Sequence, residues 1–202
     1  MQVTRIEELT KSRSKVYIDG EFAFVLYKGE LRLYHVKEGG TLEEETHRTI
    51  MGEVLPKRAK LRAMHLLKSR EYTTAQLRGK LEQGLYPPEV IELALDYVAS
   101  FHYTDDLRYA LQYITCHEND RSRRRIEQDL LGKGISRETI QAAWDRWEDE
   151  GGTQDEEGMI RRLLDKRGFS LGTADYAELQ KQAAFLMRKG FSGESIRRVL
   201  RW

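Results

Sequence analysis

The chain has 202 residues, of which 33% are charged, three are proline and one, Cys116, is cysteine. No apolar run approaches the 18 or so residues that a membrane-spanning helix needs, so an integral membrane protein is not expected. A single cysteine excludes an internal disulfide and fits a reducing compartment. We therefore expect a cytoplasmic protein in which Cys116 is a small buried residue on a helix.

The formal net charge of +1 hides a strong separation of charge along the chain. Residues 57–70 contain six Lys or Arg and no acid, residues 137–158 contain eight acids and two Arg, and residues 159–202 contain ten bases and four acids. Blocks of one sign favour an oriented contact with a charged partner.

The first 40 residues differ in composition from the rest and predict a small front module. Two runs rich in β-branched and aromatic residues, 15–18 and 22–26, flank Asp19-Gly20, which is a strong tight-hairpin signal. Residues 1–9 can supply a third strand, and residues 30–36 read as a short helix. A lone hairpin is marginal in water, so this sheet must pack on another element.

Residues 41–58 predict a connecting helix. Thr41 and Glu44 have the spacing of a capping box, with Thr41 as N-cap. Pro56 is expected to end or kink this helix because proline has no N–H to donate.

The remaining chain predicts three tandem three-helix units, at residues 59–103, 104–150 and 151–202, which would form an elongated array. Gly84, Gly134 and Gly190 each follow a helical pattern, and glycine ends a helix cheaply in the left-handed conformation. Apolar residues recur at five positions, or columns, counted from these glycines. Three residues before the glycine lie Leu81, Leu131 and Met187, and one residue after it lie Leu85, Ile135 and Phe191. Six residues after it lie Val90, Ile140 and Ile196, nine after it Leu93, Ala143 and Val199, and ten after it Ala94, Trp144 and Leu200.

Two further features support the repeat. The second unit opens with Asp105 and Asp106, whose negative charge suits a helix N-terminus. Trp144 falls in an apolar column and is expected to be buried.

The sequence contains no recognisable catalytic pattern. The five histidines show no His-His or Cys-His spacing typical of a metal site, and no phosphate loop, nucleophile elbow or dinucleotide fingerprint occurs. We expect neither an enzyme nor a bound metal or cofactor.

Four stretches carry a resemblance to a known family. Asp105 to Ala110, Leu131 to Ile135 and Phe185 to Ser192 resemble recognisable segments of the RecX family, and Lys15 to Leu26 resembles the front module of its longer members. The likeness covers nearly the whole chain and follows the repeat order. The first repeat departs from the pattern at Gly84-Leu85-Tyr86-Pro87-Pro88, which has an extra proline and no basic residue before the glycine.

The resemblance implies a non-enzymatic modulator of the RecA recombinase. Members of the family bind along the groove of the RecA filament on single-stranded DNA, and the usual consequence is inhibition of recombination, ATP hydrolysis and the SOS co-protease role. It implies a protein partner, with DNA contacted indirectly or weakly, and a monomer.

Basic residues are the candidates for the partner contact. The main set is Arg121, Arg123, Arg124, Arg125, Arg161, Arg162, Arg188 and Lys189, and an alternative cluster is Arg58, Lys60 and Arg62. Three adjacent Arg at the start of a helix point around it, so they cannot all be buried, although Glu127 or Asp129 can offset their charge. A helical protein that binds nucleic acid directly through these clusters is the second hypothesis, and a scaffold that holds other proteins is the third. The structural alternative for either cluster is a solvated helix face paired with nearby acids.

Overall fold

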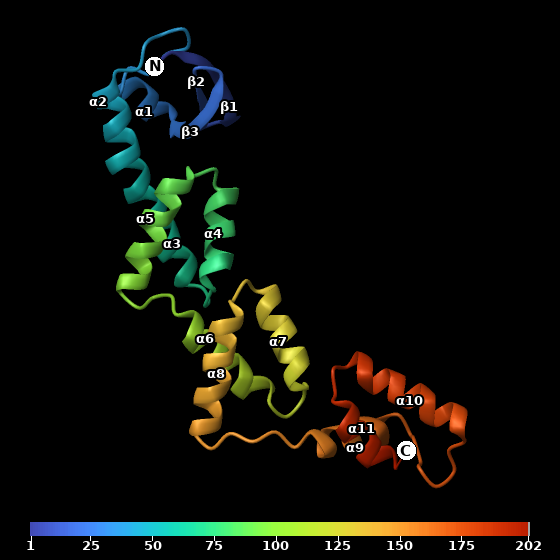
Figure 1. Cartoon of the computed structure of the whole chain (residues 1–202). Coiled ribbons are helices and arrows are strands. Elements are labelled where there is room, and N and C mark those ends of the chain that lie inside the picture. The colour runs from blue at the N-terminus through green and yellow to red at the C-terminus, as the bar shows by residue number, and fades with distance from the viewer. Residues whose placement is uncertain (202) are drawn as a thin grey trace. The chain divides into compact units, whose positions relative to one another are not determined.

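The computed structural model describes residues 1–201, which form a three-stranded antiparallel sheet followed by helices (Figure 1). The chain divides into two compact units, Met1–Asp105 and Asp106–Trp202. The expected fold class, mainly α with a small N-terminal sheet, is confirmed.

The front sheet has the order β1-β2-β3, with strands β1 (Val3–Thr10), β2 (Arg13–Ile18) and β3 (Glu21–Tyr27). Asp19 and Gly20 connect the last two strands with φ of 50° and 93°, the paired positive angles that suit a tight hairpin. Val16, Phe24 and Leu26 are buried in the core shared with the first helices. Helix α1 (Lys28–Leu33) follows at once.

One helical path joins the sheet to the first repeat through α2 (Glu44–Thr49), the π-helical turn η1 (Ile50–Val54) and α3 (Leu55–Leu67). The predicted N-cap was wrong: Glu43 holds that position, while Thr41 forms an isolated β-bridge with Gln2. The path also does not end at Pro56. The π-helical turn just before it changes the hydrogen bonding, and Pro56 falls in the first turn of α3, where it forfeits no intrahelical bond.

The first repeat consists of α3, α4 (Thr74–Gln83) and α5 (Pro88–Ser100). Thr73 caps α4 in a capping box with Gln76. The second unit contains α6 (Asp106–His117), α7 (Arg123–Gly132) and α8 (Arg137–Asp149), then α9 (Glu156–Lys166), α10 (Tyr176–Arg188) and α11 (Gly193–Leu200). These two sets of three helices enclose separate hydrophobic clusters.

The glycine turns of the second and third repeats are alike, but the first is shifted by one residue. Gly134 and Gly190 have φ of 81° and 88°, and the residue after each donates its N–H to the carbonyl five positions earlier. In the first repeat Leu85, with φ of 60°, takes the left-handed position, and Gly84 has φ of −76°. The predicted alignment of Gly84 with the other two glycines was therefore wrong.

The corrected register explains which apolar residues are inside. Leu81 now matches Leu130 and Leu186, and all three are fully buried. Trp144 is 1% exposed, as predicted, but it corresponds to Leu95 and Leu200, not to Ala94. Residues of the predicted columns that lie one step off the buried face are exposed: Leu93, Leu131 and Met187. Cys116 is exposed as well, which contradicts the expectation of burial.

Candidate partner-binding groove

Helix α7 begins close to the point where α10 ends. Ser122, the N-cap of α7, accepts a hydrogen bond from the Arg125 N–H and donates its own hydroxyl to the carbonyl oxygen of Lys189 at 2.8 Å. A Cβ on Gly190 would lie 2.7 Å from Ser122 Oγ. Only a residue without a side chain permits this approach, so Gly190 sets the contact between the second and third repeats.

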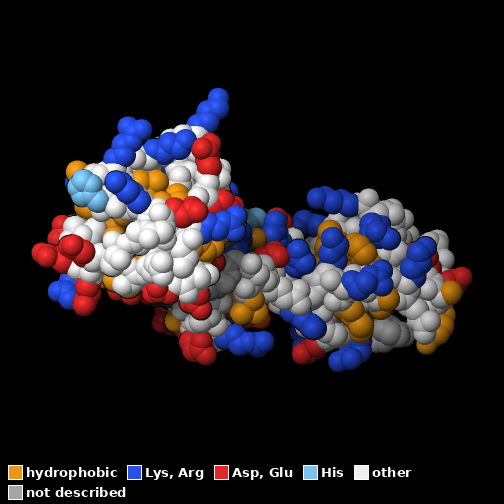
Figure 2. Space-filling view, turned by 90° about the horizontal axis from the view of Figure 1, so that it is seen from above, with side chains coloured by type: hydrophobic (Ala, Val, Ile, Leu, Met, Phe, Trp, Pro, Cys, Tyr) orange, Lys and Arg blue, Asp and Glu red, His pale blue; other side chains and the backbone are white. Residues whose placement is uncertain are grey.

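A groove of about 550 Å³ lies at this contact. Both helix ends contribute to its lining, which includes aromatic and aliphatic side chains as well as charged ones. The lining residues are Asp120, Arg121, Ser122, Arg125, Leu163, Phe185, Arg188, Lys189 and Phe191. Figure 2 shows Lys and Arg side chains interspersed with hydrophobic ones over the right-hand part of the molecule, where α9 to α11 lie. Four of the predicted basic residues thus meet in one place.

Asp129 holds the two arginines on the α7 side of the groove. One carboxylate oxygen accepts from Arg121 at 2.7 Å, and the other pairs with Arg125 at 3.1 Å. The Tyr113 hydroxyl accepts from Arg121 at 2.6 Å. Burial and the charge of Asp129 raise the pKa of Tyr113, so its hydroxyl stays protonated at neutral pH. Although burial opposes it, the Asp129 hydrogen bond raises the pKa of Arg121.

On the α10 side, the cations have no carboxylate partner among the described residues. Arg188 is exposed and no ion pair joins it to residues 1–201. Lys189 is also exposed, with Nζ 5.7 Å from the Phe185 ring centroid. Asp129 therefore offsets part of the positive charge on the α7 side of the groove, whereas no carboxylate of residues 1–201 pairs with the cations on the α10 side.

Other members of the predicted basic set lie outside the groove. Arg123 bonds Glu127 and Glu148 and lies over the Trp144 ring at 4.6 Å, so it ties α7 to α8. Arg124 is exposed, and its Cβ lies 3.4 Å from where a Gly190 Cβ would be.

The two arginines predicted on α9 have separate neighbours. Arg161 pairs with Glu157 at 2.7 Å along the helix. Arg162 reaches back to the carbonyl oxygen of Asn119 at 3.4 Å.

The alternative basic cluster does not converge on one surface. Arg58 is half-buried, donates to the Val25 carbonyl at 3.0 Å, pairs with Glu30 and lies over the Tyr27 ring. It therefore fastens α3 to the sheet. Lys60 lies over Tyr97 at 4.9 Å, and Arg62 is exposed.

The remaining predicted residues have structural positions. Gly84 caps the C-terminus of α4, and a Cβ there would lie 2.9 Å from the Tyr86 ring. Asp106 stands in the first turn of α6, as its charge predicts, and Asp105 precedes it.

Sequence reasoning missed the uncharged half of the groove. The apolar lining residues are Leu163, Phe185 and Phe191. In the sequence, an apolar residue on a helix predicts a buried core position, so nothing in their type indicated a groove. Phe185 carried a weak signal, because it belongs to the family-like stretch at residues 185–192.

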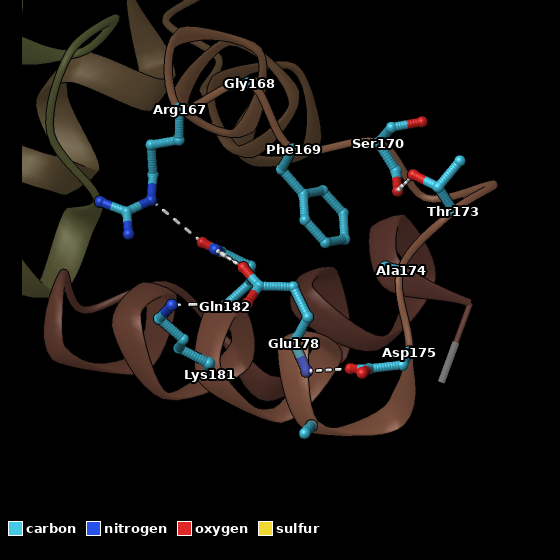
Figure 3. Close-up of a pocket in the computed structure, with 11 residues that line it drawn as sticks. Arg167, Gly168, Phe169, Ser170, Thr173, Ala174, Asp175, Glu178, Lys181 and Gln182 are labelled. Atoms are coloured by element: carbon cyan, nitrogen blue, oxygen red, sulfur yellow. Dashed lines mark hydrogen bonds and ion pairs between the residues drawn. The ribbon is translucent and has the colours of Figure 1, made fainter.

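A second hollow, of about 480 Å³, lies under the long loop at residues 167–175 (Figure 3). Arg167 Nε donates to Gln182 Oε1 at 3.0 Å, and Gln182 in turn donates to Glu178, whose pKa is lowered mainly by this bond. Asp175 caps α10 by accepting from the Glu178 N–H. The polar groups that line this hollow form hydrogen bonds with one another, so we interpret it as part of the packing of the loop and not as a binding site.

The described residues contain no group of three or more His, Cys, Asp or Glu placed to hold a metal ion. Within the same residues, no helix combines the length and apolar character needed to cross a membrane.

Comparison with known proteins gives the family. Sequence models of the first, second and third three-helix domains of RecX match residues 59–97, 105–143 and 155–200. A "Regulatory protein RecX" from Caldanaerobacter subterraneus subsp. tengcongensis is 29% identical, over 99% of this chain and 98% of its own.

A shorter relative and a solved structure agree. The "Regulatory protein RecX" of Trichlorobacter lovleyi is 31% identical over 73% of this chain and 97% of its own. A crystal structure of regulatory protein RecX has a TM-score of 0.63, with 24% identity, and covers 99% of this chain and 98% of that one. The chain therefore belongs to the RecX family of regulatory proteins.

Proposed function

We propose that this protein binds the RecA filament on single-stranded DNA and restrains its activity without catalysing a reaction itself. The groove between the start of α7 and the end of α10 would be a main contact. Family membership gives the regulatory role, and the groove supplies a surface that fits a large anionic partner.

The observation that carries the proposal is the meeting of Arg121, Arg125, Arg188 and Lys189 around one groove. Guanidinium groups bind carboxylate or phosphate oxygens through two hydrogen bonds at once. Arg188 and Lys189 make no ion pair with residues 1–201 and so remain available. Phe185 adds an apolar contact beside them, which is typical of the centre of a protein interface.

A partner held in this groove would be restrained by contact alone. Binding that favours one state of the filament shifts its population toward that state, by as much as the protein's affinities for the two states differ. Recombination, ATP hydrolysis and the SOS co-protease role all depend on the active filament, so one binding event would lower all three. The proposal needs no cofactor, and it places a monomeric protein in the cytoplasm with its partner.

The test reverses the charge of Arg188 and Lys189, the two cations on the α10 side of the groove. Arg188→Glu with Lys189→Glu should weaken binding to RecA-coated single-stranded DNA by at least tenfold and reduce inhibition of ATP hydrolysis to the same extent. The wild-type affinity should fall as salt is added, because the contact is electrostatic. Binding is measured by fluorescence anisotropy, in parallel with bare DNA.

The control variant is Arg137→Glu with Arg146→Glu, which makes the same change in net charge on exposed positions of α8. It should bind nearly as well as wild type. Equal losses in both variants would mean that only net charge matters, and unchanged inhibition by the groove variant would exclude this groove as the contact.

Direct binding to nucleic acid is the second candidate. It predicts strong, salt-sensitive binding to bare single-stranded DNA that RecA does not increase. The same parallel titration separates the two proposals.

A further inference from the structure

Three aromatic rings form a row at the end of the first repeat, and two of them, Phe101 and Tyr103, are exposed. The Tyr97 and Phe101 ring centroids are 5.0 Å apart, and those of Phe101 and Tyr103 are 5.8 Å apart with the planes inclined by only 19°. Phe101 is 55% exposed and Tyr103 is 49% exposed. Tyr97 is half-buried and packs against the core of the first unit, whereas Phe101 and Tyr103 lie beyond the inner face of α5, which Val90, Ala94 and Val98 bury.

Lysines stand at both ends of the row. Lys60 Nζ lies 4.9 Å from the Tyr97 ring centroid. At the other end, Lys68 and Tyr103 line an open apolar hollow of about 230 Å³ with Met64 and Leu67.

Two of the lysines, Lys57 and Lys60, lie on α3, and Lys68 is its C-cap residue. Lys57, Lys60 and Lys68 recur at spacings of three and eight residues, which place them along one side of a helix. Residues 57–70 contain no acid that could neutralise them within the same stretch. A cation thus lies near each end of the row of rings.

Exposed aromatic rings interleaved with cations are the surface that single-stranded nucleic acid requires. Each unpaired base can stack on a ring face whatever its identity, while the cations follow the phosphates. Duplex DNA does not fit, because its bases are already stacked on one another. A protein surface is the competing occupant, and the binding experiment below distinguishes the two.

We propose that Phe101 and Tyr103, with Tyr97 behind them, stack the bases of a single strand, and that Lys60 and Lys68 contact its phosphates. Two or three rings accommodate about two or three nucleotides. This site is separate from the groove in the second unit, and it does not depend on RecA.

The experiment measures binding of a fluorescein-labelled oligothymidylate of about twenty nucleotides to the full chain by anisotropy. Phe101→Ala with Tyr103→Ala should weaken binding about tenfold or more, while Phe101→Tyr with Tyr103→Phe should retain it. Leu33→Ala, at an exposed apolar position of the same unit, is the control and should bind as wild type does. Circular dichroism checks that each variant is folded.

Two further measurements identify the chemistry. An abasic strand of the same length keeps the phosphates but loses the bases, so it should bind wild type as weakly as oligothymidylate binds the double Ala variant. Lys60→Gln with Lys68→Gln should lower the salt dependence of binding by about one or two units of slope, and the aromatic variants should leave that slope unchanged.

Equal affinity of wild type for the abasic and thymidylate strands would overturn the proposal. So would a double Ala variant that binds oligothymidylate like the Leu33→Ala control. If that variant lost binding only to RecA-coated DNA, the row would be a protein contact and the nucleic-acid assignment would be wrong.

Discussion

Ser122 and Lys189, 67 residues apart in sequence, are joined by a 2.8 Å hydrogen bond from the Ser122 hydroxyl to the Lys189 carbonyl oxygen. The same hydroxyl caps α7 by accepting from the Arg125 N–H. One side chain therefore begins a helix of the second repeat and fixes the end of a helix of the third. The basic groove exists because these two helix ends are held together.

Gly190→Ala should destabilise this contact. A non-glycine residue in the left-handed region costs about 1–2 kcal/mol, and the added Cβ would also press on Ser122 Oγ at 2.7 Å. Gly79→Ala is the matched control, because Gly79 lies inside α4 with open space around it and should gain about 0.5–1 kcal/mol. Denaturant unfolding measures both, and a Gly190→Ala protein as stable as wild type would contradict the assigned contact.

Trp144→Ala should be among the most damaging single changes. The side chain is 1% exposed and packs edge-on against Trp147 at 5.2 Å between centroids. Removing a buried tryptophan costs about 3–5 kcal/mol, through lost transfer energy and the cavity that remains. Leu93→Ala, at a position that is 46% exposed, should change the unfolding free energy by about 0.5 kcal/mol or less. A small loss for Trp144→Ala would show that the corrected repeat register is still wrong.

The sequence predicted the helices and the hairpin because local periodicity and turn residues determine them. The prediction for the first repeat was wrong, because it placed Gly84 in the left-handed conformation, and Leu85 adopts it instead. Tyr86 then packs against the core of the first unit and lines a small cavity with Tyr27 of the sheet, and no local sequence pattern predicts this tertiary packing. The turn that departs from the family pattern thus lies beside the sheet of the front module.

The candidate site was predictable in part. Arg125 and Asp129 lie four residues apart on one helix, so their pairing follows from spacing. The approach of Arg188 to Arg125 depends on how two repeats pack, which no local pattern encodes. Arg58 illustrates the opposite error, because a basic residue in a basic stretch proved to be half-buried under the sheet.

Arg58→Lys should lower stability although the charge is retained. The guanidinium bonds the Val25 carbonyl and Glu30 while lying 4.6 Å from the Tyr27 ring centroid, and a lysine cannot make this forked contact. Losing a hydrogen bond from a charged group costs about 1.5–3 kcal/mol. Arg48→Lys, in an exposed pair with Glu44, should cost no more than about 0.5 kcal/mol in the same unfolding experiment. Equal effects would mean that Arg58 is only a surface cation.

Stability should fall at alkaline pH partly through Tyr86. Burial raises the pKa of its hydroxyl above the ordinary value of about 10, so the folded chain keeps a proton that the unfolded chain releases. The contribution is complete below the unfolded-state pKa of about 10 and is lost as the pH rises from there through the higher folded-state pKa. Tyr86→Phe should therefore show a smaller loss of unfolding free energy than wild type as the pH rises above about 10. Parallel curves for wild type and Tyr86→Phe would refute the assignment.

Asp129→Asn should act on stability and on binding in opposite directions. The carboxylate holds Arg121 at 2.7 Å and Arg125 at 3.1 Å, so its neutralisation should cost about 1–3 kcal/mol. It also frees both guanidiniums beside Arg188, which makes the groove more positive. If the groove binds the anionic filament, affinity for RecA-coated DNA should increase by a fewfold, opposite in sign to Arg188→Glu with Lys189→Glu. Asp149→Asn, an exposed change of equal charge on α8, is the control. Equal affinities for the two variants, measured by anisotropy below the unfolding transition, would show that the Asp129 pairs do not limit binding.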